Sequence, residues 1–244
     1  MPATLAEIQR FRDTENKQMI NYLSKCSIGS LSMSTITVAG VRIRIRGESD
    51  NKLSSIHMKS IRTAVEDVVG VGHRLPSLDF YLTSCVDVPN VAMKTYTAGT
   101  HTPVIFLGPK MWAKNVQMPK SAGAVVGGLG TAGPRGVADQ AYDGTNRFFG
   151  NPKQKAQGAT IVIHELGHVL HEHLNPGIFW EEMAAVYALA RSPNAPAWTN
   201  EANKVSAYAM NNPLEFVAEV FAGRLIGKVY PDTTIAAYDA LGGP

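Results

Sequence analysis

Three residues within one short stretch have the types and the spacing of a metal site that activates water. His164 and His168 are four positions apart, so on an α-helix their imidazoles lie on one face, about one turn apart, and can bind the same ion. Glu165 projects beside that ion, where its carboxylate can accept a proton from a water held at the metal. The His-Glu-x-x-His spacing therefore predicts a zinc site that performs hydrolysis.

The surroundings of this motif favour a buried site over a chance occurrence on an exposed helix. A largely apolar run over 159–163 precedes the motif and Val169-Leu170 follows it. Imidazole and carboxylate groups in such a helix need partners, and a metal ion supplies them. Gly167 costs about 1 kcal/mol relative to alanine inside a helix, which indicates that another segment packs closely there. The whole pattern is typical of zinc metalloproteases.

A catalytic zinc ion usually takes three protein ligands, so a third ligand must come from further along the chain. Two common arrangements are excluded. His171 and Leu174 stand where the long metzincin motif has glycine and histidine. No acidic residue lies near Ala188, about 20 residues after the second histidine, where thermolysin-like enzymes have their ligand glutamate.

Two glutamates remain as candidates for the third ligand. Glu182 follows the turn at 175–177, and an antiparallel helix hairpin would bring it level with the motif. Glu215 follows Pro213, which suits the first turn of a helix, and Glu219 lies one turn further on the same face. Two carboxylates in so apolar a helix need a partner or a metal. The pattern favours Glu215 and keeps Glu182 as the alternative.

The segment from Tyr208 to Phe221 resembles the zinc-site segment of the lethal-factor-type metallopeptidases. That family includes the catalytic domain of anthrax lethal factor and the secreted Pro-Pro endopeptidases. Its members carry a tyrosine seven residues before the ligand glutamate and a second glutamate four residues after it, and Tyr208, Glu215 and Glu219 match these positions. The resemblance covers only about residues 160–221, so substrate preference does not carry over.

This resemblance implies a role for each of the polar residues around the site. The roles are: His164, His168 and Glu215 as zinc ligands, Glu165 as general base, Tyr208 as the group that stabilises the transition state, and Glu219 as a partner that orients a histidine or the tyrosine. A hydrogen bond from the tyrosine to the developing oxyanion is typically worth about 3 kcal/mol. The plainer alternatives are a packing tyrosine and a surface glutamate.

An endopeptidase of this kind also needs an edge strand that pairs with the main chain of an extended substrate. We expect that strand at 136–141, with Gly136, Val137 and Ala138 in contact with substrate, because it precedes a predicted strand at 146–149 and the motif helix. Ala124 to Gly127 is the alternative. The glycine-rich segment 121–136 contains no phosphate-binding motif, so it is either a flap over the substrate or a plain loop.

Two further histidines on the motif helix are assigned no ligand role. His171 is two turns from His164, too far to share one ion comfortably, so we expect it at the rim of the cleft or at the helix end. His173 is expected to face solvent.

The elements expected along the chain place a β-rich part before a helical part. The first part contains a helix over 5–23 with a break near 13–14, strands over 27–34 and 35–46 that meet near Ala39-Gly40, a helix over 51–69 capped by Asp50, and strands over 78–84, 91–97 and 104–107. The second part contains the motif helix from 157 to 175 and helices over 178–191, 201–210 and 213–228, with a short one from 231.

This order predicts an α+β fold of the zincin-like type, with a small twisted sheet in the N-terminal part packed on the metal-site helix and an all-helical C-terminal part. We expect a single domain over 1–244. Within it, residues 1–155 form a β-rich subdomain and residues 156–244 form a helical subdomain that carries the zinc ligands.

The composition excludes some classes of partner. The chain has 244 residues, 45% of them hydrophobic, and a net charge of +3 that is too small to indicate binding to nucleic acid or to a membrane surface. The N-terminus has no Sec-type signal peptide, which predicts a cytoplasmic protein or one exported by a specialised route, for example into a host or target cell. Cys26 and Cys85 have no metal-like spacing, and whether they pair is open.

Together these features predict a zinc-dependent endopeptidase that acts on a protein or peptide, with a bacterial effector or toxin as its expected role. Two alternatives stay open. The same water would also attack a non-peptide amide or ester, or the metal would hold together a binding module that has no activity. Oligomeric state and cleavage specificity are not predicted.

Overall fold

The computed structural model of the chain describes residues 4–25, 32–47, 51–82, 93–96, 102–107, 157–187, 195–206 and 208–244. These residues form one sheet with several helices, so the expected α+β class is confirmed. Several predictions lie outside the described residues: the strands at 136–141 and 146–149, the glycine-rich segment 121–136, the cap Asp50, and the cysteines Cys26 and Cys85.

The described elements follow the expected order of a β-rich part and then a helical part. The first part comprises α1 (Leu5–Lys25), β1 (Ser32–Val38), β2 (Val41–Gly47), α2 (Asn51–Gly70), β3 (Leu78–Leu82), β4 (Met93–Tyr96) and β5 (Val104–Leu107). The second part comprises α7 (Gln157–Leu174), α8 (Pro176–Tyr187), α9 (Ala195–Val205), α10 (Pro213–Leu225) and α11 (Asp232–Ala240).

Several helices differ from the expectation, among them α10, which ends at Leu225 rather than near 228. Helix α1 runs through 13–14 without the expected break. Helix α8 begins at Pro176 rather than at 178. Proline is tolerated there because the backbone N–H groups of a helix's first turn make no hydrogen bond within the helix. Helix α9 covers 195–205 rather than 201–210, and the Ser206 hydroxyl accepts a hydrogen bond from the backbone N–H of Ala209 in the turn that follows it.

The sheet has five strands in the order β1-β2-β3-β5-β4. Its central strands β2, β3 and β5 are parallel, whereas β1 and β4 run antiparallel to their neighbours at the two ends. All residues of β3 are buried, as expected for a parallel strand covered on both faces. Strand β4 pairs with β5 along one edge, and no other described strand pairs with it.

The turn between β1 and β2 lies at Ala39-Gly40, as expected, but the expected strand boundary at 34–35 is wrong because both residues lie inside β1. Both turn residues have positive φ, 47° at Ala39 and 82° at Gly40, as a two-residue hairpin turn of type I′ requires.

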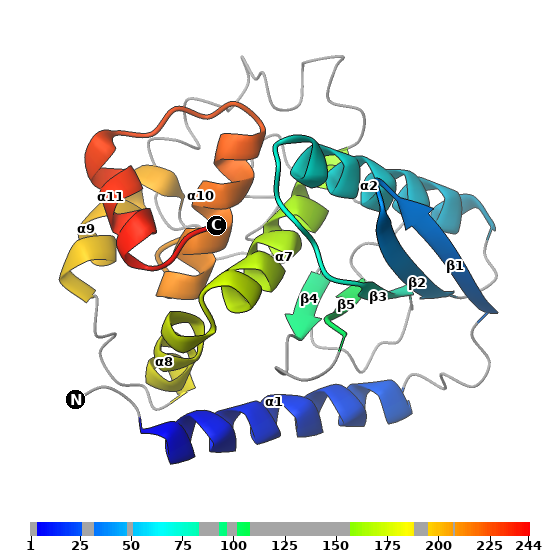
Figure 1. Cartoon of the computed structure of the whole chain (residues 1–244), viewed down its shortest axis with the longest axis horizontal. Helices are drawn as coiled ribbons and strands as arrows, with labels where there is room; N and C mark the ends of the chain where they lie inside the picture. The colour runs from blue at the N-terminus through cyan, green and yellow to red at the C-terminus, as the bar shows by residue number, and fades with distance from the viewer. Residues whose placement is uncertain are drawn as a thin grey trace.

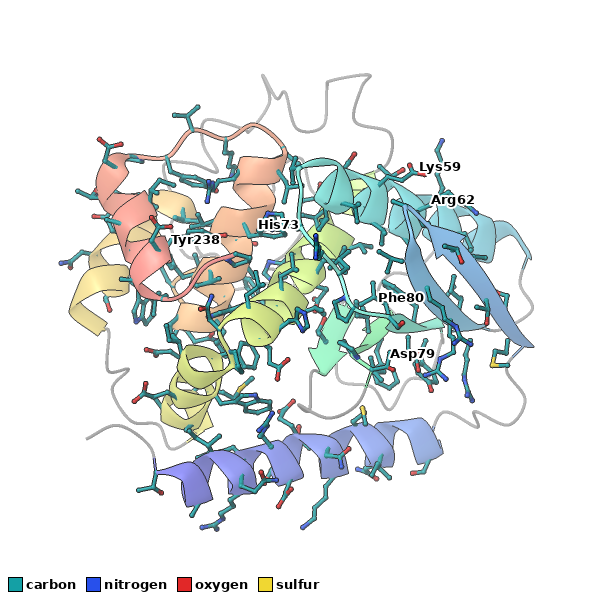
Figure 2. The ribbon with its side chains drawn as sticks, viewed as in Figure 1. Lys59, Arg62, His73, Asp79, Phe80 and Tyr238 are labelled. Atoms are coloured by element: carbon teal, nitrogen blue, oxygen red, sulfur yellow. The ribbon has the colours of Figure 1, made fainter. Side chains whose placement is uncertain are left out.

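Helices α2 and α7 pack against each other and share one apolar core with the sheet. Figure 1 shows α7 crossing the centre of the molecule, between α2 with the sheet on one side and α10 on the other. In Figure 2, Phe80 and Asp79 extend from β3 in opposite directions. Phe80 lies in the shared core, and Asp79 accepts two hydrogen bonds of 2.6 Å from Arg44 on the opposite face.

Helix α1 packs along α8 and touches β4. The guanidinium of Arg12 lies 5.1 Å from the ring centre of Trp180 in α8. None of the helices in the described ranges is both long and apolar enough to cross a membrane.

Candidate metal centre

Helix α7 carries the His-Glu-x-x-His motif through the interior of the molecule. The apolar residues on either side of the motif histidines are buried: Val162, Ile163, Leu166, Val169 and Leu170. A helix that is apolar almost all round is a core helix, and here it lies between the sheet and α10. His164 is only 2% exposed, so its imidazole must find its partners inside the protein.

Helix α10 supplies the partner carboxylates, and local sequence fixes where it begins. The side chain of Asn212 caps the helix by accepting a 3.0 Å hydrogen bond from the backbone N–H of Glu215. Pro213 occupies the first turn, where it needs no hydrogen-bond partner for its nitrogen. This start places Glu215 in the first turn, with its side chain facing α7.

Gly167 allows α7 and α10 to approach closely. A Cβ atom at Gly167 would lie 3.0 Å from Cδ1 of Phe221 and 3.3 Å from Cα of Ala218, both in α10. Distances this short require a neighbour to shift, and the Ala218 atom belongs to backbone. The close packing predicted from the glycine is confirmed, and the partner is the helix that carries Glu215.

The two helices bring His164, His168 and Glu215 together. Oε2 of Glu215 lies 3.0 Å from Nε2 of His164 and 3.4 Å from Nε2 of His168. One ligand atom from each residue lies within 4.8 Å of the other two, close enough to hold one metal ion. Glu182, the alternative ligand, is buried in α8 and is not part of this group.

The electrostatics of this group favour a positive charge. Burial lowers the pKa of His164, but hydrogen bonding and attraction to Glu215 and Glu219 outweigh it and raise that pKa to about 10. Burial raises the pKa of Glu215, but His168 and His164 together hold it well below its ordinary value. The proton on His164 thus balances charge that a bound cation would balance instead. Two imidazole nitrogens and a carboxylate oxygen fit a metal ion of the kind found in catalytic sites.

Glu219 lies behind His164 rather than on the surface. Its Oε1 is 3.1 Å from Nδ1 of His164, and its Oε2 accepts a 2.7 Å hydrogen bond from the hydroxyl of Ser206. Glu219 is 5% exposed, so the alternative of a surface carboxylate is wrong. A carboxylate on the second nitrogen of a ligand histidine fixes both the ring orientation and the tautomer.

Tyr208 lies next to the same histidine. The centres of the Tyr208 and His164 rings are 5.8 Å apart. Burial raises the pKa of Tyr208, and the charges of Glu215 and Glu165 raise it further. The phenol therefore keeps its proton across the physiological range and can donate a hydrogen bond.

Glu165 has a partner that sequence reasoning missed. The hydroxyl of Thr95 in β4 donates a 2.5 Å hydrogen bond to Oε2 of Glu165. Thr95 was expected in a strand, but nothing in its sequence context indicates that this strand lies beside the motif helix. Ser206 was also missed, because nothing in its sequence context indicates that its hydroxyl contacts Glu219.

The structure corrects the expectation for His171. This residue was expected at a cleft rim or at the helix end, but it is fully buried, and its Nε2 lies 2.7 Å from the carbonyl oxygen of Leu241. Asn175 donates a 2.8 Å hydrogen bond to the carbonyl of Gly242, so both residues hold the C-terminal tail against α7. His173 is exposed, as expected.

The expected substrate residues Gly136, Val137 and Ala138 lie outside the described residues. Strand β4, which the structure does describe, packs directly against α7.

Comparison of the chain with protein-family models, with curated proteins and with solved structures finds no match.

Proposed function

We propose that this protein is a zinc-dependent endopeptidase. The observation that carries the proposal is the convergence of His164, His168 and Glu215 on one point. Two imidazoles and one carboxylate are the donor set of a well-known type of catalytic zinc site, which favours zinc over the harder ions that oxygen ligands bind.

We infer a zincin-like arrangement of the fold. The support comes from the sheet packed on the motif helix, with its antiparallel edge strand β4 beside that helix. The resemblance of the segment from Tyr208 to Phe221 to the lethal-factor-type metallopeptidases supports the same inference from the sequence.

The chemistry follows from the side chains around the three ligands. Zinc, when bound, would lower the pKa of a coordinated water and polarise the substrate carbonyl. Glu165 accepts the proton of that water and later delivers it to the leaving amine. Tyr208, protonated in its buried position, donates a hydrogen bond to the oxyanion that develops on the carbonyl. Thr95 holds one oxygen of Glu165 and leaves the other for the proton.

The substrate class that fits this site is an extended polypeptide. Strand β4 has one edge without a described partner, and Thr95 places this strand within a hydrogen bond of the base. An extended peptide added along that edge would run beside Glu165 and present its carbonyl groups to the site. We therefore propose β4 as a substrate-pairing strand in addition to the expected segment at 136–141.

The test compares wild type with Glu165→Gln, which keeps the shape of the side chain and removes its basicity. Both proteins are loaded with zinc, and their metal content is measured. Each is then incubated with a denatured proteome, and new protein N-termini are identified by mass spectrometry. We expect new termini with wild type and at least a 100-fold lower yield with Glu165→Gln, in line with the usual contribution of a general base.

Two results would contradict the proposal. Equal yields from the two proteins would exclude the assigned role of Glu165. The absence of new termini with zinc-loaded wild type would point to a non-peptide substrate or to a binding function.

A further inference from the structure

Ser206 is the most deeply buried hydroxyl near the metal centre. It follows the last residue of α9, is 0% exposed, and its backbone N–H donates a 3.1 Å hydrogen bond to the carbonyl of Ala202. Its Oγ makes two further hydrogen bonds. It donates to Oε2 of Glu219 at 2.7 Å and accepts from the backbone N–H of Ala209 at 3.0 Å. One oxygen atom therefore joins the end of α9, the following loop and α10.

One branch of this arrangement leads to the metal ligand His164. Oε2 of Glu219 accepts the hydrogen bond from the Ser206 hydroxyl, and Oε1 of Glu219 lies 3.1 Å from Nδ1 of His164. All three side chains are at most 5% exposed, so water does not compete for these contacts. The position of the Glu219 carboxylate, and through it the orientation of the imidazole, depends on the hydroxyl.

The other branch leads to Tyr208. The hydrogen bond from Ala209 to Ser206 fixes the residue directly after Tyr208. The backbone N–H of Asn211 closes a turn onto the carbonyl of Tyr208 at 3.0 Å, and Asn212 then caps α10. The loop that carries the phenol is thus held at its beginning by the hydroxyl and at its end by the helix cap.

We propose that Ser206 is a positioning residue that fixes both the orientation of the metal ligand His164 and the position of the Tyr208 phenol beside it. The expected effect of Ser206 on metal affinity requires only that His164, His168 and Glu215 bind a metal ion. The effect of Ser206 on turnover rests on the proposed endopeptidase function. Ser206 touches neither the ligand nitrogen nor the site of reaction, and it acts through Glu219 and through the loop.

Removal of the hydroxyl has two expected consequences. Glu219 loses a hydrogen bond and the N–H of Ala209 loses its acceptor, both in a buried place where replacement by water is costly. Loss of a direct partner behind a ligand histidine typically weakens metal binding about 10- to 100-fold, and because Ser206 acts through Glu219 we expect the lower end of this range, about 10-fold. We expect this loss in Ser206→Ala, and we expect Ser206→Thr, which keeps the hydroxyl, to recover most of the affinity.

The matched control is Thr234→Val. Thr234 is also fully buried and donates a 2.6 Å hydrogen bond to a carboxylate, Oε2 of Glu201, but this pair joins α11 to α9 away from the ligands. Removal of the Thr234 hydroxyl therefore eliminates a buried hydrogen bond comparable to that of Ser206. We expect Thr234→Val to lower the melting temperature and to leave zinc affinity within a factor of about two of wild type.

The primary measurement is zinc affinity by competition with a chromophoric chelator. The visible absorption spectrum of the cobalt-substituted protein serves as a second readout, because it reports the ligand geometry without any substrate. We expect an altered spectrum for Ser206→Ala and unchanged spectra for Ser206→Thr and Thr234→Val. If Ser206→Ala does not fold, Ser206→Cys, which is similar in size but a weak donor, takes its place.

The kinetic measurement separates positioning from a structural role. Once a cleaved peptide is known, zinc-saturated Ser206→Ala should lose kcat with little change in KM, because Tyr208 acts on the transition state. A fall in zinc affinity that is equal in Ser206→Ala and Thr234→Val would overturn the proposal. Wild-type affinity in a folded Ser206→Ala would do the same.

The outcomes also separate this proposal from the proposed function. Weaker zinc binding by Ser206→Ala together with no peptide cleavage by wild type would support the positioning role and reject the endopeptidase. Cleavage by wild type together with unchanged zinc affinity and kcat in Ser206→Ala would do the reverse.

Discussion

The hydroxyl of Thr95 links the sheet to the motif helix α7. It donates to Oε2 of Glu165 at 2.5 Å from the edge strand β4. A carboxylate with one oxygen anchored presents the other in a defined direction, which is what a group that must take up and return a proton requires.

Replacement of Thr95 by valine should slow peptide cleavage and leave metal binding intact. Valine keeps the branched shape but cannot donate to Glu165, and a hydrogen bond to a charged group is worth about 1.5–3 kcal/mol. We expect kcat/KM to fall roughly 10- to 100-fold, with zinc content unchanged and activity largely kept in Thr95→Ser. Full activity in Thr95→Val would show that Glu165 needs no such anchor.

At this scale, sequence gave good predictions where residues act at fixed spacing within one element. The i, i+4 spacing of His164 and His168 and the apolar surroundings of Glu215 indicated residues that the folded chain brings together. Thr95 and Ser206 could not be found in this way. Their partners are distant in sequence, and a threonine in a strand or a serine after a helix is common without any role at a site.

The crossing of α7 and α10 determines the geometry of the site at the scale of elements. Each helix supplies part of the candidate ligand set, and the two helices approach where Gly167 leaves room for Ala218 and Phe221. A change in the separation of these helices therefore changes the distance between Glu215 and the histidines.

Gly167→Ala should weaken zinc binding by pushing the two helices apart. The added Cβ would lie 3.3 Å from backbone of α10, and overpacking of this kind typically costs about 1–3 kcal/mol, against a gain of about 1 kcal/mol in helix propensity. We expect lower zinc affinity together with a lower or unchanged free energy of unfolding of the apo-protein.

The control for this change is Gly177→Ala in α8. A Cβ atom there would meet nothing within 4 Å, so the substitution should leave zinc affinity unchanged and slightly stabilise the helix. Unaltered zinc affinity in Gly167→Ala would mean that the helix separation does not control the site.

Most elements were predictable, and their boundaries less so. Alternating and helical patterns indicated most of the described elements, but the expected boundary between the strands at 27–34 and 35–46 falls inside β1. The start and the end of α9 were missed, and its end was missed because the turn that follows depends on the hydrogen bond between the Ser206 side chain and the Ala209 backbone. Propensity does not report a side-chain contact of this kind.

For the whole molecule, the order of the strands could not be predicted. Strand β5 lies between β3 and β4, so the edge position of β4 reflects a crossover that the sequence pattern does not encode. The α+β class and the position of the motif helix at the junction of the two parts did follow from the order of elements. The attachment of the C-terminal tail to α7 through His171 also appeared only in three dimensions.

This attachment should make the stability of the molecule sensitive to acid. Burial lowers the pKa of His171 from 6.5 to about 3. Because the unfolded chain takes up this proton first, stability is lost as the pH falls below about 6.5 and continues to fall toward about 3. Between pH 8 and pH 5 this one group should cost about 2 kcal/mol in the free energy of unfolding.

The measurement is urea unfolding of wild type and His171→Gln at pH 8 and pH 5, with chelator present so that metal binding does not contribute. We expect the variant to lose less stability than wild type over this interval, whatever its stability at pH 8. Equal losses in the two proteins would mean that His171 does not remain neutral in the folded chain.

The division of the ligands between α7 and α10 has a consequence for how the protein would acquire its metal. His164 and His168 are available as soon as α7 forms, whereas Glu215 joins them only when α10 has docked. Metal binding would then proceed in two stages. The ion would first associate rapidly and reversibly with the two histidines, and the carboxylate of Glu215 would bind it more slowly. The rate of the second stage would measure the docking of two helices, so the time course of metal uptake by a refolding chain would report when α10 packs on α7.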